Sequence, residues 1–70
     1  MNQNRLERRL GILEFTQAYC LENSISPTVR DIQRACEVSS TSIVHSDLKW
    51  LHATGYIDWV SGTARGIKVL

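Results

Sequence analysis

The sequence has no hydrophobic stretch near the roughly 20 apolar residues that a membrane-spanning helix requires. Charged residues near its N-terminus are not followed by an apolar segment of signal-peptide length. These two absences argue against a membrane-bound or secreted protein. We therefore expect a soluble intracellular protein with no membrane partner.

Cysteine is scarce, and the two cysteines present, Cys20 and Cys36, do not form a CxxC pair. Both lie in segments with periodic apolar residues, which is typical of small buried thiols. We predict free thiols in a reducing compartment, with neither a disulfide nor a metal site. Nothing in the sequence calls for a cofactor.

Excess charge is also missing, since the net charge is only +1. That value is low for a protein that holds DNA by charge alone, because non-specific affinity comes from neutralising phosphates. The charge neither suggests nor excludes DNA as a partner. No repeat, linker or low-complexity stretch divides the 70 residues, and 43% of them are apolar. We predict one globular domain over residues 1–70.

Apolar residues at spacings of three and four predict a first helix from Arg5 to Leu21, ended by Asn23 and Ser24. Its apolar positions are Leu6, Leu10, Ile12, Leu13, Phe15, Tyr19 and Cys20.

A second helix is predicted from Val29 to Cys36. Pro27 disfavours helix at the residue before it, Thr28 can cap the new helix, and Asp31 places an acid in the first turn. Its predicted buried positions are Ile32, Ala35 and Cys36. A short connection, residues 37–39, then brings Val38 back to the core, so the pattern indicates a helix-turn-helix.

The third predicted helix has Ser39 or Ser40 as its N-cap and ends at Gly55. Val44, Leu48 and Leu51 face inward. Residues 56–60 and 67–70 are β-rich and flank a turn at 61–66, which predicts a terminal hairpin. The fold class is therefore mainly α with a small β-hairpin (α+β), a three-helix winged helix-turn-helix in the order α-α-α-β-β.

Small hydroxyl residues line the start of the third helix, so its backbone can approach the floor of a DNA groove closely. Helical periodicity turns one stripe of side chains outward, and such a stripe suits the major groove. The alternative is an ordinary cap with a solvated face. His45 can donate to guanine or phosphate, or be inert, and nearby Asp47 lowers the positive potential. The stripe comprises Thr41, Ser42, His45, Ser46, Lys49 and His52.

Three flanking features suit phosphate contacts. Thr28, the amides after it and the Arg30 side chain can meet a phosphate at the second helix. Arg65, at the hairpin tip, can reach a phosphate or the minor groove. The alternative for Arg30, as for Arg34, is an ordinary surface charge, and the alternative for Arg65 is an exposed turn residue that aids solubility. The basic cluster of Arg5, Arg8 and Arg9 is interpreted as a solvated face, with phosphate contact as the alternative.

The aromatic residues and histidines indicate no catalysis. Trp50 is predicted at the edge of the core, or as part of a protein contact. Tyr56 and Trp59 are predicted to pad the hairpin. The histidines lack a carboxylate partner at a nucleophile, and neither cysteine is placed for activation, so we expect no catalytic residues and no enzyme activity.

Several segments together resemble the N-terminal DNA-binding domain of the LexA family of SOS-response repressors. They are Ser26-Pro27-Thr28-Val29-Arg30-Asp31-Ile32, residues 39–51, Gly55-Tyr56-Ile57 and residues 60–70. The resemblance implies base reading in the major groove by the start of the third helix, with Ile43 available for a thymine methyl group. It also implies a wing arginine at Arg65. The implied base-reading residues are Ser40, Thr41, Ser42, Ile43, His45 and Ser46.

Two departures from the family pattern affect the expectations. Glu37 stands where the family turn has glycine, which implies a slightly different turn and places an acid near DNA. The self-cleaving serine-lysine domain of the family, which also dimerises the repressor, has no counterpart in these residues, so we expect no switch by self-cleavage.

The resemblance implies a sequence-specific DNA-binding transcriptional regulator, a repressor in the cytoplasm of a bacterium or encoded by a phage. Its partner is double-stranded DNA, and strong binding needs a homodimer on a palindromic site. The competing hypothesis is a small winged-helix adaptor that binds a protein partner such as a host regulator through Trp50 and the wing.

Overall fold

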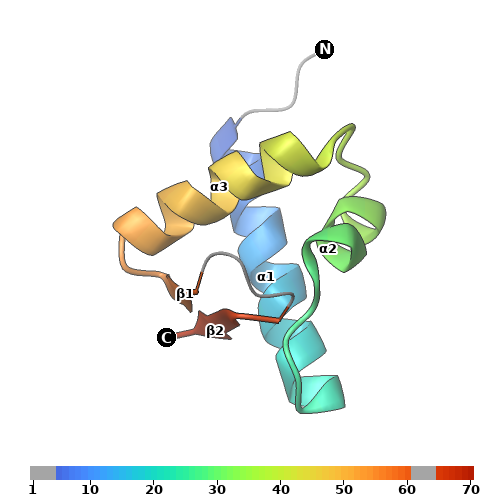
Figure 1. Cartoon of the computed structure of the whole chain (residues 1–70), viewed down its shortest axis with the longest axis vertical. Helices are drawn as coiled ribbons and strands as arrows, with labels where there is room; N and C mark the ends of the chain where they lie inside the picture. The colour runs from blue at the N-terminus through green and yellow to red at the C-terminus, as the bar shows by residue number, and fades with distance from the viewer. Residues whose placement is uncertain (1–4, 61–64) are drawn as a thin grey trace.

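The computed structural model describes residues 5–60 and 65–70. Three helices, α1 (Arg5–Asn23), α2 (Val29–Ala35) and α3 (Thr41–Ala53), precede two strands, β1 (Ile57–Trp59) and β2 (Ile67–Val69). In Figure 1, α3 crosses the N-terminal half of α1, α2 lies on one side of α1, and the hairpin lies below α3. The predicted winged helix-like α+β class is confirmed. The first four residues and most of the predicted wing turn, residues 61–64, lie outside the described residues.

Helix α1 runs two residues further than predicted and ends at Asn23. Ser24 has a φ of +60° and donates its N–H to the Cys20 carbonyl at 2.9 Å, a left-handed stop. Ile12 is fully buried, whereas Leu6 and Leu10 are 49% and 41% exposed. These two residues belong to the apolar periodicity but lie outside the core. Leu10 lies about 200° around the helix from Ile12, on the opposite side.

Helix α2 begins with a capping box. The Asp31 N–H donates to the Thr28 hydroxyl at 3.1 Å, and the Thr28 N–H donates to the Asp31 carboxylate at 3.0 Å. Ile32 is fully buried, as predicted. Ala35 is exposed and Cys36 half-buried, so the prediction for Ala35 was wrong. The helix ends at Ala35. Val38, three residues later, is buried in the core.

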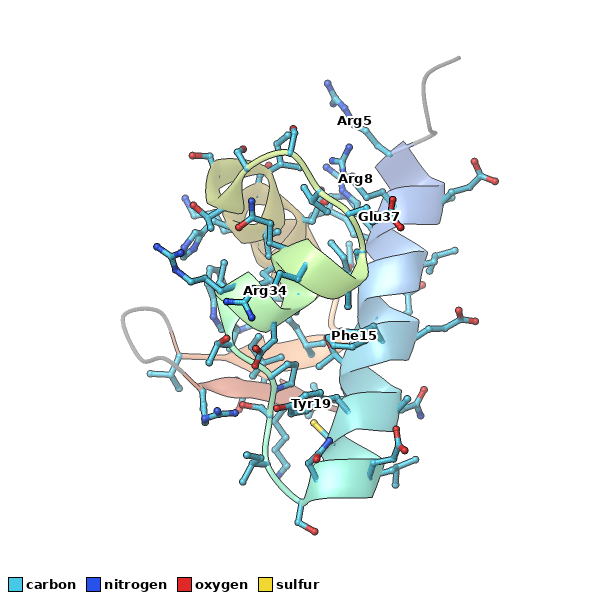
Figure 2. The ribbon with its side chains drawn as sticks, turned by 90° about the vertical axis from the view of Figure 1, so that its right-hand side faces the viewer. Arg5, Arg8, Phe15, Tyr19, Arg34 and Glu37 are labelled. Carbon is cyan, nitrogen blue, oxygen red and sulfur yellow. The ribbon has the colours of Figure 1, made fainter. Side chains whose placement is uncertain are left out.

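The turn after α2 closes with Glu37 in the left-handed conformation, at a φ of +53°. Its N–H donates to the Arg34 carbonyl, and the Val38 N–H donates to the Gln33 carbonyl at 3.0 Å. These two bonds form a Schellman motif, in which glycine is usual at the left-handed position. A side chain at position 37 was expected to imply a slightly different turn, but Glu37 adopts a left-handed conformation of the kind that glycine takes without strain. Figure 2 shows Glu37 on the surface.

The hydrophobic core lies where α3 meets the other elements. Val44, Leu48 and Leu51 are fully buried, as predicted. The hairpin is antiparallel, with Trp59 opposite Ile67, and both side chains join the core. Phe15 and Tyr19 extend from α1 toward α2 with their ring centroids 5.7 Å apart (Figure 2). Within the described residues, no helix has the length and apolarity to span a membrane.

Candidate nucleic-acid interface

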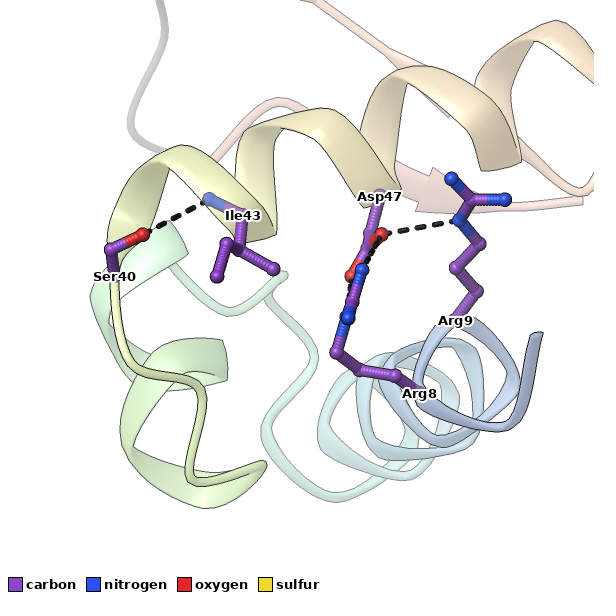
Figure 3. Close-up of polar contacts among 5 residues, drawn as sticks. All are labelled: Arg8, Arg9, Ser40, Ile43 and Asp47. Atoms are coloured by element: carbon purple, nitrogen blue, oxygen red, sulfur yellow. Dashed lines mark hydrogen bonds and ion pairs between the residues drawn. The ribbon is translucent and has the colours of Figure 1, made fainter. Parts of the chain in front are cut away.

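Helix α3 begins at a serine cap. Ser40 has extended backbone, and its hydroxyl accepts the Ile43 N–H at 3.3 Å (Figure 3). The choice between Ser39 and Ser40 is thus settled in favour of Ser40. Because this bond uses an acceptor site of the hydroxyl, the hydroxyl hydrogen stays free to donate elsewhere.

The outward stripe of α3 is confirmed as an exposed surface. Ile43 is half-exposed and packs partly against the core. Thr41 is also half-exposed. The surface therefore combines small hydroxyl groups near its start with cationic or titratable groups further along. Its exposed members are Ser42, His45, Ser46, Lys49 and His52.

The hairpin borders this stripe on one side. The His45 ring lies 5.7 Å from the Trp59 ring, so His45 rests against β1. Further along, His52 Nε2 lies 3.8 Å from an Asp58 carboxylate oxygen, with both side chains largely exposed. The stripe is therefore continuous with the wing.

Arg65 joins the wing to the segment before α2. Its guanidinium Nη1 donates to the Ser26 carbonyl at 2.6 Å. Hydrogen bonds from Thr28 hold the pKa of Asp31 below its ordinary value, and the charges of Arg65 and Arg34 lower it further. The structure thus brings Arg65 toward the start of α2, where Arg30 is exposed.

Asp47 is the polar residue whose position the sequence interpretation missed. It is fully buried and accepts hydrogen bonds from Arg8, one of them at 2.8 Å, and from Arg9 at 3.1 Å (Figure 3). These bonds to Asp47 raise the pKa of Arg8. Asp47 is three residues after Val44 and four before Leu51, a spacing that marks the inward face.

The interpretation of the basic cluster as a solvated face was therefore wrong for two of its members. The Arg8 and Arg9 side chains are only 22% and 16% exposed because they pack over Asp47. Arg5 is exposed, as predicted.

The aromatic side chains pack mainly within the domain. The Arg9 guanidinium carbon lies 4.6 Å from the Trp50 ring centroid, and the Trp50 and Tyr56 rings stack with centroids 6.2 Å apart. Trp50 is half-buried, as expected at the edge of the core, whereas Trp59 is buried and Tyr56 exposed. Sequence reasoning missed the contact between Arg9 and Trp50, which arises only when α1 and α3 pack together.

The cysteines are free and half-buried rather than fully buried. Burial raises the pKa of the Cys36 thiol, which favours the protonated form. In the part of the chain that the structure describes, no group of histidine, cysteine and acidic residues is arranged to hold a metal ion.

Comparison with known proteins adds independent information. A protein-family model described as LexA DNA binding domain matches residues 3–66. A LexA repressor from Roseiflexus sp. is 37% identical over 62 residues, which are 89% of this chain and 28% of that protein. A LexA repressor from Clostridium botulinum is 34% identical over all 70 residues, or 35% of its own length. The chain spans about a third of the length of these curated relatives.

Proposed function

The chain belongs to the LexA DNA-binding domain family, and from this membership we propose that it binds duplex DNA sequence-specifically as the DNA-binding part of a transcriptional repressor. The family model that matches describes a DNA-binding domain. The observation that carries the proposal is the exposed stripe of small hydroxyl and basic side chains along α3, beside the hairpin.

In this proposal α3 lies in the major groove and its first two turns read base edges. Hydroxyl groups donate to or accept from any base, and His45 donates to guanine. The exposed part of Ile43 contacts a thymine methyl group. Lys49, one turn beyond His45, neutralises a phosphate or contacts guanine. The proposed base readers are Ser40, Thr41, Ser42, Ile43, His45 and Ser46.

The wing and α2 hold the DNA backbone. The hydrogen bond from Arg65 to the Ser26 carbonyl draws the guanidinium toward the cap residue Thr28. A single phosphate can then accept from Arg65 and from the amides that follow Thr28, with Arg30 beside it. These contacts fix the position of α3 without reading sequence.

One recognition helix and a net charge of +1 give modest affinity. We therefore propose two copies on a palindromic site, in the cytoplasm, where DNA occupancy represses genes of the SOS response. The adaptor hypothesis has less support, because the Trp50 surface that it requires already packs against Arg9 and Tyr56.

Selection from a random duplex pool, followed by fluorescence anisotropy with the selected duplex, tests this function. The expected result is a defined sequence preference and an affinity that falls steeply as salt rises. The single strand of the same sequence is the control and should bind more weakly. Undetectable binding to every duplex at about 50 mM salt would contradict the proposal and favour a protein partner.

A further inference from the structure

A basic hollow opens on the side of the α3 stripe away from the wing. Arg5, Arg8 and Arg9 of α1 line it together with Ile43 and Ser46 of α3, around a volume of about 360 Å³. His45 contacts Trp59 of the wing, whereas the next residue, Ser46, lines this hollow. The wing and the hollow therefore border the reading stripe on opposite sides.

The hollow keeps a positive charge although an acid lies beside it. Asp47 offsets one of the three arginine charges, which leaves a net charge of +2. The bonds to Asp47 use two N–H groups of Arg8 and one of Arg9. Each guanidinium carries five such groups, so both retain donors for an anion.

Their positions are also fixed before any ligand arrives. The Asp47 carboxylate holds both guanidiniums (Figure 3). The Arg9 guanidinium also lies over the Trp50 ring. Holding flexible side chains in place in advance lowers the entropic cost of binding. Arg5 is exposed, and Figure 2 shows it extending beyond Arg8 at the start of α1.

We propose that this hollow binds a backbone phosphate of duplex DNA. The phosphate belongs to one of the two backbones that border the major groove, and the wing contacts the other. This inference rests on the proposed function. The groove is about 12 Å wide, close to the diameter of a helix with its side chains. Side chains bordering both edges of α3 can thus reach both backbones. Asp47 acts as a positioning residue for Arg8 and Arg9.

The first test is Arg5→Gln, which removes an exposed charge and leaves the bonds to Asp47 in place. With the selected duplex, we expect about an eight-fold loss of affinity at about 0.1 M salt. The slope of log K against log salt should fall in magnitude by about one. The sequence preference should stay the same. The control is Lys68→Gln, an equal loss of charge at a β2 residue that lines a hollow with Gln17 and Leu21 of α1 and not the α3 stripe, so it should leave the slope unchanged.

A scan of neutral methylphosphonate substitutions along the duplex identifies the phosphate. A methylphosphonate at one position should weaken the binding of wild-type protein but should weaken the binding of Arg5→Gln little further. Free inorganic phosphate is the other possible source of the anion, and it should compete only at high concentration. If wild-type protein binds its duplex but Arg5→Gln keeps the full affinity and slope, the hollow proposal is overturned. If wild-type protein binds no duplex, the proposed function itself fails.

Asp47→Asn separates positioning from charge. The substitution keeps the shape of the side chain and raises the net charge by one, so electrostatics alone would tighten DNA binding. A positioning role requires the opposite result, weaker binding with a shallower salt slope, in protein shown by circular dichroism to be folded. Tighter binding would refute the positioning role of Asp47.

Discussion

Arg8 and Asp47 lie 39 residues apart in the sequence, yet the Arg8 guanidinium donates two hydrogen bonds to the fully buried Asp47 carboxylate. Arg9 donates a third. This contact ties the first turns of α1 to the middle of α3. It therefore links the stability of the fold to the orientation of the helix that we propose reads DNA.

Removing Arg8 should destabilise the domain strongly, because it leaves a buried carboxylate with only Arg9. For Arg8→Met we expect a loss of about 3 kcal/mol in the free energy of unfolding, measured by urea denaturation. In the double variant Arg8→Met/Asp47→Leu, much of that loss should disappear because no buried charge remains. Arg34→Gln, an exposed arginine of α2 (Figure 2), is the control. Additive costs in the double variant would argue against this coupling.

The capping box at α2 should make stability depend on pH in the acid range. The pKa of Asp31 is lower in the folded chain than its ordinary value of about 3.9. The ionised carboxylate therefore stabilises the fold at any pH above that ordinary value. That contribution is lost as pH falls through the folded pKa. Urea midpoints of wild type and Asp31→Asn, measured from neutral pH downward, should differ at neutral pH and converge in acid. A constant difference across this range would contradict the assignment.

Glycine at position 37 should stabilise the domain. The left-handed conformation of Glu37 costs roughly 1–2 kcal/mol of folding free energy, and glycine avoids that cost. Glycine in turn loses about 0.4–1 kcal/mol of stability, because it gives the unfolded chain more conformational freedom. We expect Glu37→Gly to gain about 0.5 kcal/mol in thermal or urea unfolding. Glu37→Ala removes the same charge but keeps Cβ, so it should bring no such gain. Equal effects of the two substitutions would show that charge, not backbone conformation, is responsible.

Arg65→Ala should weaken DNA binding without changing the preferred sequence, because a phosphate contact holds the protein without reading bases. The readouts are the dissociation constant and the selected sequence profile. An altered profile would instead assign Arg65 to base recognition.

Local signals allowed the boundaries of α2 and α3 to be predicted. The cap at Thr28 and its partner Asp31 are three residues apart, and the Ser40 cap lies beside the helix that it starts. The burial of Asp47 was harder to predict, because its arginine partners are distant in sequence and charged residues are usually exposed. Likewise, the exposed side of α1 depends on which face the other helices cover, so apolar spacing alone does not show that Leu6 and Leu10 lie outside the core.

The central claim is that α3 reads base sequence, and the most direct test compares the duplexes selected from a random pool by wild type, Ser42→Ala and His45→Ala. Arg65→Ala serves as the control for a general loss of affinity. The account predicts that each α3 variant changes the preference at particular base positions within the site. Unchanged preference in both α3 variants, with only weaker overall binding, would contradict the placement of α3 in the major groove.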